Sequence, residues 1–229
     1  MKLQKETNLR QSAHGRWYDD ACGTAFALEL IGERWALLIV RELMLGARRF
    51  SDLRASLPGI SAKVLTERLA GLEASGVLLR RPLLPPASGQ VYELTEWGYR
   101  AEPIMQELGR WAASSPLHDA TLPMSAVSMM LSLRTMFDPA RAGKRKAWIG
   151  FDIGGNTFVA RLKDGALPIA RRPFDSPDFA FTAADAQVLV ALFYGKVDPG
   201  ELEAAGALRI TGDRAAALDF AALFEIPKL

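Results

Sequence analysis

The sequence of 229 residues predicts two domains, a mainly α domain followed by an α+β domain that contains one small sheet. Apolar residues recur at steps of three and four through much of the first half, which is the periodicity of helices packed on a core. The stretch ASSPLHDATLP, near residue 118, has the small and proline-rich composition of a linker. After it, strand-like runs are grouped early and helical runs stand at both ends, an order typical of an α+β layer.

The composition narrows the class of protein. The net charge is +2 and the isoelectric point is near 8.8, values that permit a polyanionic partner without requiring one. A single cysteine cannot form an internal disulfide, so nothing points to an oxidising compartment. The first 20 residues lack a signal-peptide core, and no run approaches the roughly 18 apolar residues of a membrane span. We expect a cytoplasmic protein that has no membrane segment and needs no cofactor.

The chain divides into four expected segments. They are a loosely ordered N-terminal extension over 1–21, a first domain over 22–114, a linker over 115–123 and a second domain over 124–229. The first domain begins with apolar residues at helical intervals between Cys22 and Leu45, where Gly32 is the expected joint between two helices.

The next stretch, RRFSDLRASL, predicts a short helix that ends before Pro58, because the residue before a proline is pushed out of helical geometry. Gly59 supplies a turn at little steric cost, and Ser61 is a suitable N-cap for the following helix. Leucines at steps of four and three give that helix an inward face, made of Leu65, Leu69 and Leu72. The residues expected to face outward are Lys63, Thr66, Glu67 and Ala70.

A hairpin and a further helix complete the first domain. The runs VLLRR and QVYEL predict two strands joined by a loop over 82–90. Thr95 can cap the helix, and Pro103 should kink it or mark its true start. An apolar stripe follows along it at steps of four and three: Trp97, Ala101, Ile104, Leu108 and Trp111. Because a small domain cannot easily hide two tryptophans on one stripe, we expect a second copy of the chain to cover them in a homodimer.

The predicted elements follow the order of a winged helix-turn-helix. They are a short helix, a tight turn, a helix with a polar outer face and a hairpin. Such a fold places the second helix in the major groove of double-stranded DNA, while basic residues on each side meet phosphates. The candidate DNA-binding residues are Arg48, Arg49, Ser61, Ala62, Lys63, Thr66, Glu67, Arg68, Arg80, Arg81, Ser88 and Gln90. The alternative interpretation is that these are ordinary solvated groups on a helical domain.

From Cys22 to Trp111 the chain resembles the HxlR family of bacterial transcription regulators. The segments that carry the resemblance are LELIGERW, RRFSDLR, LPGIS and VLTERLAGLEASG, followed by VYELTEWG. The resemblance implies a dimeric winged-helix protein on a pseudo-palindromic operator, with the helix from Ser61 as reader, the 82–90 loop as wing and terminal helices at the dimer interface. The wing loop PLLPPASGQ departs from this expectation because it carries no basic residue.

Cys22 falls where some members of that family keep a redox- or electrophile-sensing cysteine. A thiol at a helix N-terminus can have its pKa lowered, since the helix dipole favours the thiolate. The alternative interpretation is a small buried residue at the head of an apolar helix, because free cysteine is among the residues most often buried.

The second domain begins with the Met-rich helical stretch MSAVSMMLSLRTMF, after which KAWIGFDIGGNTFVARLKDGALPIARR predicts three short strands. Thr182 with Asp185 forms an expected capping pair that opens a helix. The last strand and helix, ALRITG and DRAAALDFAALF, lie in a region that resembles the sterol carrier protein type two fold. That resemblance implies an apolar pocket for a hydrophobic small-molecule effector, with candidate lining residues Met129, Met130, Trp148, Phe151, Phe158 and Phe193. The alternative is that these residues simply form the core.

The run IGFDIGGNTF also resembles the phosphate loop of sugar kinases that have an actin-like fold. Asp152 would then be the metal-coordinating or catalytic carboxylate beside Gly154 and Gly155. Too little chain follows for the two lobes of such a kinase, and no second Gly-rich phosphate segment follows. A hairpin turn explains the two glycines better, and we expect a protein that is not an enzyme.

Overall fold

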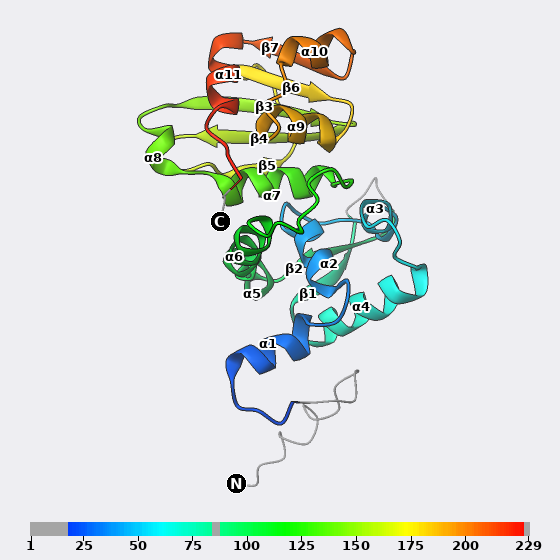
Figure 1. Ribbon diagram of the computed structural model, residues 1–229. Coiled ribbons are helices and arrows are strands. Elements are labelled where there is room, and N and C mark those ends of the chain that lie inside the picture. Colours follow the sequence, from blue (N-terminus) through cyan, green and yellow to red (C-terminus); the bar gives the residue numbers. More distant parts are fainter. Residues whose placement is uncertain (1–17, 84–87, 227–229) are drawn as a thin grey trace. The chain divides into compact units, whose positions relative to one another are not determined.

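The computed structural model describes residues 18–83 and 88–226, which form two compact units, Met1–Ala101 and Glu102–Leu229 (Figure 1). The 1–21 extension therefore lies mostly outside the described residues, and so do residues 84–87 of the wing loop. Within the described part of the chain, no helix is both long enough and apolar enough to cross a membrane. The division between the units falls at Ala101, earlier than the boundary expected at 114.

The first unit is mainly helical, with one antiparallel hairpin of β1 and β2. Its elements are α1 Gly23–Ile31, α2 Ala36–Leu43, α3 Phe50–Ser56, α4 Ala62–Ala74, β1 Leu78–Pro82, β2 Gln90–Leu94 and α5 Glu96–Tyr99. The predicted order of helices and hairpin is confirmed. Helix α2 lies at the centre, because it contacts α3, α4 and β2.

The joint between α1 and α2 is longer than a single glycine. Helix α1 is capped by Gly32, but α2 starts only after Trp35, whose φ of 79° lies in the left-handed region. The ring of Trp35 comes within 3.8 Å of the place that a Cβ on Gly59 would take. Gly59 itself has φ of 91°, a conformation that costs glycine little. Trp35 therefore supports the Pro58–Gly59 corner from which α4 departs.

The helix expected after Thr95 is two helices, α5 and α6 Glu102–Ala113. Proline has no N–H, so Pro103 cannot donate to the carbonyl of Tyr99, and it fits only in the first turn of a helix. Of the two expected roles for Pro103, marking the true start is confirmed. The expectation of one continuous apolar stripe from Trp97 to Trp111 is wrong for the same reason.

Helix α6 clusters with the second unit because its side chains are tied to α7, Ala126–Met136. Arg134 forms an ion pair of 2.8 Å with Glu102, and Arg110 donates from Nε to the carbonyl of Thr135 at 2.9 Å. Gly109 also faces Thr135, and a Cβ at Gly109 would lie 3.7 Å from the Thr135 methyl group, an ordinary contact distance.

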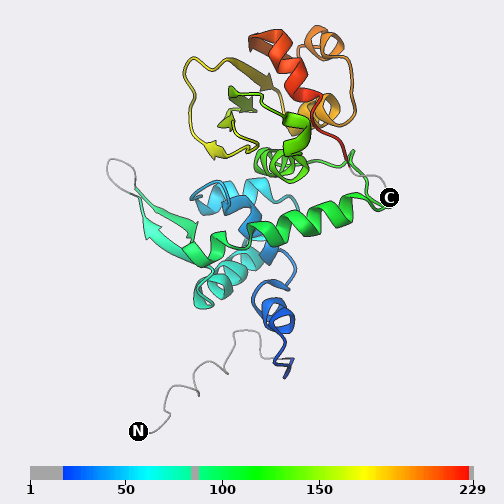
Figure 2. The same cartoon turned by 90° about the vertical axis from the view of Figure 1, so that its left-hand side faces the viewer.

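The second unit is an α+β layer with a five-stranded sheet in the order β5-β4-β3-β6-β7. Among the described strands of this sheet, β3 and β6 are parallel neighbours and the other neighbouring pairs are antiparallel. The elements after α7 are α8 Pro139–Ala142, β3 Ala147–Ile153, β4 Asn156–Leu162, β5 Ile169–Arg171, β6 Phe179–Ala183, α9 Ala186–Phe193, α10 Pro199–Ala204, β7 Leu208–Gly212 and α11 Arg214–Ala221. Figure 2 shows α9 and α11 on one side of the sheet, and both contact β6. Strand β6 and helices α8 and α10 were not predicted from the sequence.

Aromatic side chains fill the layer between this sheet and its helices. The fully buried rings are Phe151, Phe158, Phe179, Phe181, Phe193, Phe220 and Phe224. Six of them make ring contacts with one another whose centroid distances run from 5.1 to 6.5 Å. Offset and edge-to-face pairs at such distances stabilise a core beyond the area that they bury.

Candidate nucleic-acid interface

Helix α4 presents the expected outer face. Ser61 caps its start, accepting a hydrogen bond from the backbone N–H of Val64 at 3.2 Å. The inward leucines are buried: Leu65, Leu69 and Leu72. Exposed on the other side are Ala62, Lys63, Thr66, Glu67, Ala70 and Ala74. The predicted inward and outward faces of this helix are confirmed.

Polar side chains on the outer face make few strong interactions within the domain. The ammonium of Lys63, whose side chain is 86% exposed, lies 3.9 Å from a carboxylate oxygen of Glu67. An exposed pair of this kind contributes little to stability, so Lys63 is free to exchange Glu67 for a phosphate or a base edge. Thr66 donates its hydroxyl proton to the carbonyl of Ala62 at 2.9 Å, which leaves its oxygen open as an acceptor.

Arg68 does not lie on this face as a free cation. Its side chain donates from Nε to the carbonyl of Arg34 at 3.1 Å and forms an ion pair of 2.9 Å with Glu33. Only 18% of the side chain is exposed. Arg68 therefore ties α4 to the segment before α2, and its first role is structural.

Arg48 is also a structural residue, with only 9% of its surface exposed. It donates to the hydroxyl of Ser56 at 3.1 Å and to the carbonyl of Asp52 at 3.4 Å, while its backbone pairs with Tyr92 in β2. Arg49 is exposed beside it, and so is Arg54 on α3. Arg54 was not among the predicted DNA-binding residues, although its place on a short helix next to the turn makes it a further candidate.

The hairpin carries its basic residues on β1. Arg80 is opposite Tyr92 and Arg81 is opposite Val91, and each arginine side chain is about half exposed. Arg80 lies 4.0 Å from Glu73, and Arg81 is paired with Glu93. Ser88 and Gln90 are exposed where the second strand begins. A phosphate near this hairpin would compete with two carboxylates for the two guanidiniums.

The first unit matches a known family over most of its described length. The profile described as HxlR-like helix-turn-helix matches residues 30–118. The chain is 40% identical over 87 residues to the uncharacterized HTH-type transcriptional regulator YvaP of Bacillus subtilis, covering 38% of this chain and 80% of YvaP. The chain belongs to the HxlR-like helix-turn-helix family.

Other similarities cover the same part of the chain or the part after it. The HTH-type transcriptional regulator YodB of Bacillus subtilis is 38% identical over 86 residues, which are 38% of this chain and 77% of YodB. A solved structure of the reduced form of YodB is 34% identical, covers 44% of this chain and 100% of that one, and has a TM-score of 0.39. The profile of the SCP-2 sterol transfer family matches residues 133–225. The protein therefore combines an HxlR-like helix-turn-helix domain with an SCP2 domain.

The HxlR-like domain leaves apolar helical surface exposed. No residue of α1 is buried, and Phe26 and Leu28 on it are each about half exposed. Trp97 on α5 is about half exposed as well, and Ala101 is partly exposed.

Helix α6 of the second unit also leaves apolar side chains uncovered, because its other side packs on α7. Ile104 and Leu108 are about half exposed, and Trp111 is 77% exposed. Apolar area of this kind on a short helix is a common mark of an interface.

Cys22 is exposed at the N-cap of α1, so the expectation of a buried residue is wrong. The backbone N–H groups of Ala25 and Thr24, and the Thr24 side chain, favour the thiolate and hold the pKa of the Cys22 thiol below its ordinary value. The physical cause is that N–H donors at a helix start stabilise the thiolate.

The six residues expected to line an apolar pocket do not surround one space. Met129, Met130, Phe151, Phe158 and Phe193 are fully buried in the packed layer of the SCP2 domain. Trp148 points to the other face of the sheet, where the guanidiniums of Arg161 and Arg172 lie 5.2 and 5.1 Å from its ring. For five of the six, the structure shows core positions.

The Asp152–Gly155 run is a tight turn between β3 and β4. The carboxylate of Asp152 accepts from the backbone N–H of Gly155 at 2.9 Å, and the N–H of Gly154 donates to the carbonyl of Ala183 at 3.0 Å. Both glycines have positive φ. Because these N–H groups are already used, the turn does not form a phosphate loop.

Proposed function

We propose that this protein is a sequence-specific, DNA-binding transcriptional regulator that works as a homodimer on a pseudo-palindromic operator. The observation that carries the proposal is the exposed outer face of α4, anchored from behind by three buried leucines. Its small residues Ala62, Ala70 and Ala74 let the helix backbone approach a groove closely. Lys63 and Thr66 stand between them with groups that can contact base edges. Such a protein works in the cytoplasm and is not an enzyme.

Selection of genomic fragments by the purified full chain tests this function. We expect a small set of fragments that share an inverted repeat, and we expect gel shifts with these fragments to survive competition by unrelated DNA. Retention of fragments without any shared sequence would contradict sequence-specific reading.

The wing gives a separate prediction about phosphates. Replacing Arg81 by alanine should weaken binding to every DNA sequence and should reduce the slope of log K against log salt by about one unit. Arg80→Ala should act in the same way. Arg100→Ala is a matched control, since Arg100 is an exposed arginine of the same unit outside the wing. An unchanged affinity and an unchanged salt slope in both wing variants would contradict the assignment of the hairpin as a wing.

The proposed dimer is supported by the uncovered apolar side chains of α1 and α6. We expect Trp111→Ser to raise the dissociation constant of the dimer about ten-fold or more, because truncating a large aromatic at an interface centre often costs over 1.4 kcal/mol. Sedimentation velocity over a concentration series measures this change. Leu117→Ala, at another exposed apolar residue, is the control. A wild-type chain that stays monomeric at all concentrations would contradict the dimer.

Control by oxidants through Cys22 is a second candidate, which its exposure and lowered pKa favour. We expect diamide or a quinone to weaken operator binding by the wild-type chain and to leave binding by Cys22→Ser unchanged. The chain has one cysteine, so this single substitution removes every thiol. Equal binding by both proteins with and without oxidant would contradict the sensor.

A hydrophobic small-molecule effector in the SCP2 domain is a further candidate, which the match to the SCP-2 sterol transfer family supports. Such a ligand would enter the layer that now holds Met129, Met130 and the phenylalanine rings. Methionine side chains are flexible enough to rearrange around a ligand, so the α7 side of that layer can adapt to one. Native mass spectrometry of the purified chain, with and without added fatty acids, tests the proposal. The absence of any bound mass, together with an operator affinity that fatty acids leave unchanged, would contradict it.

A further inference from the structure

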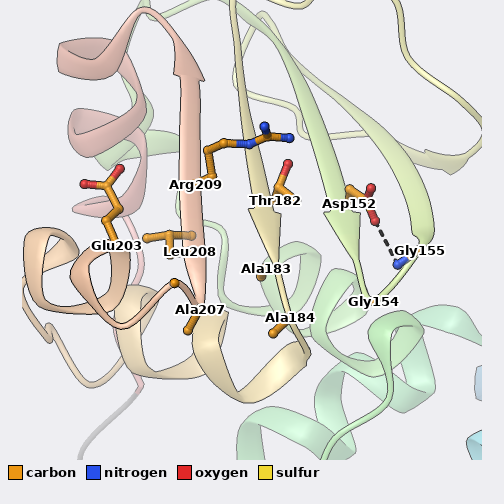
Figure 3. Close-up of a pocket in the computed structure, with 11 residues that line it drawn as sticks. Asp152, Gly154, Gly155, Thr182, Ala183, Ala184, Glu203, Ala207, Leu208 and Arg209 are labelled. Carbon is orange, nitrogen blue, oxygen red and sulfur yellow. Dashed lines mark hydrogen bonds between the residues drawn. The ribbon is translucent and has the colours of Figure 1, made fainter.

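The SCP2 domain has a pocket on the sheet face that points away from the phenylalanine core. Its volume is about 670 Å³, and it opens at one end of β3, β6 and β7 (Figure 3). Neighbouring residues of a strand point to opposite faces, so Asp152 points away from the core because Phe151 points into it. The same alternation places Thr182 beside Asp152 on β6, and Arg209 beside Thr182 on β7. The pocket is therefore crossed by one row of three polar side chains.

The three side chains of this row keep free binding capacity. Asp152 uses Oδ1 to accept from Gly155, which leaves Oδ2 open. Within the described residues, no hydrogen bond or ion pair engages the guanidinium of Arg209 or the hydroxyl of Thr182. Glu203 on the rim differs, because both of its oxygens are held at 2.7 Å by Arg214. A guanidinium, a hydroxyl and a carboxylate oxygen are thus available in the pocket to bind a ligand.

The spacing of the charges limits what can fit. Adjacent strands are about 4.8 Å apart, so the backbones that carry Asp152 and Arg209 are on the order of 10 Å apart. Figure 3 shows the Arg209 side chain reaching across β6 toward Thr182. The guanidinium is therefore brought toward Asp152, yet it forms no ion pair with it in the described structure. An opening with a cation on one side and an anion on the other fits a ligand that carries both charges.

We propose that this pocket binds a free α-amino acid. The fork of Arg209 holds the carboxylate, Asp152 accepts from the ammonium, and the hydroxyl of Thr182 lies between them. Small residues, Ala184, Gly206 and Ala207, also line the pocket and leave room for a side chain.

Two other ligand classes fit less well. A phosphate group would face the carboxylate of Asp152, and the N–H groups of Gly154 and Gly155 are already bonded. A wholly apolar ligand would strip water from Asp152 and Arg209 without replacing the lost hydrogen bonds, which is unfavourable.

Isothermal titration calorimetry on the full chain, with each standard L-amino acid in turn, tests the proposal. We expect at least one to bind, and we expect propionate and ethylamine, which carry one charge each, to bind about ten-fold more weakly or not at all. Arg209→Gln and Asp152→Asn should each weaken the bound amino acid about ten-fold or more. Asparagine keeps an oxygen for the Gly155 N–H, so the turn is preserved. Arg161→Gln is the control, since Arg161 lies on the same sheet face outside the pocket.

Three results would overturn the proposal. They are no heat from any amino acid up to about 10 mM, binding as tight in Arg209→Gln and Asp152→Asn as in the wild type, or equally tight binding of propionate. Far-ultraviolet circular dichroism and thermal melting confirm that each variant is folded. Since no DNA is present, the outcome is independent of whether α4 reads an operator.

Discussion

Leu69→Ala is expected to lower the unfolding free energy of the HxlR-like domain by about 2–5 kcal/mol and to abolish operator binding. Leu69 is 1% exposed and lies between the other two anchors of α4, so its loss leaves a cavity directly behind the reading helix. Denaturant unfolding, followed by far-ultraviolet circular dichroism, measures the change. A loss of this size is a large fraction of the total unfolding free energy of a small domain.

Ala70→Ser is the matched control for that measurement, because Ala70 is the next residue and faces outward. We expect its unfolding free energy to stay within about 0.5 kcal/mol of the wild type, the difference in helix propensity. If Leu69→Ala were as stable as Ala70→Ser, the leucines would not anchor α4.

Phe151→Ala is expected to lower the unfolding free energy of the SCP2 domain by about 3–5 kcal/mol. The ring of Phe151 lies 5.5 Å from that of Phe181 and 6.5 Å from those of Phe193 and Phe220, so its loss opens the centre of the aromatic layer. Thermal unfolding by calorimetry measures the change.

Leu117→Ala serves as its control, since Leu117 is exposed and its truncation should stay within about 0.5 kcal/mol. A small effect of Phe151→Ala would contradict a packed layer. It would instead favour a loose interior able to admit a hydrophobic ligand.

The parts of the fold that depend on local pattern were predictable. Helix α4 follows from three leucines at helical spacing and a serine cap, and the β1–β2 hairpin follows from two apolar runs around a proline-rich loop. Strand β6 was missed because FAFTA lacks a clear alternation, since Phe179, Ala180 and Phe181 are all buried. Thr182 therefore looked like a helix cap, whereas it lies in β6 and Asp185 alone caps α9.

In the candidate sites too, local features were predictable and contacts between distant parts of the chain were not. Lys63 and Thr66 were placed correctly on the outer face because one helix decides their direction. The ion pair of Arg68 was not predictable, because its partner, Glu33, is distant in the sequence and meets it only in the folded domain. The pocket of Asp152, Thr182 and Arg209 exists only through the register of three strands, one of which the sequence did not indicate.

The most direct test of the central claim is the sequence preference of reading-helix variants. Fragments retained from a genomic pool by the wild-type chain, by Lys63→Ala and by Thr66→Ala are sequenced and compared. If α4 reads base edges, at least one variant should relax or change the preferred base at defined positions of each half-site, at a cost of about 1–3 kcal/mol for the original operator. Identical preferred sequences and identical operator affinities for all three proteins would contradict it.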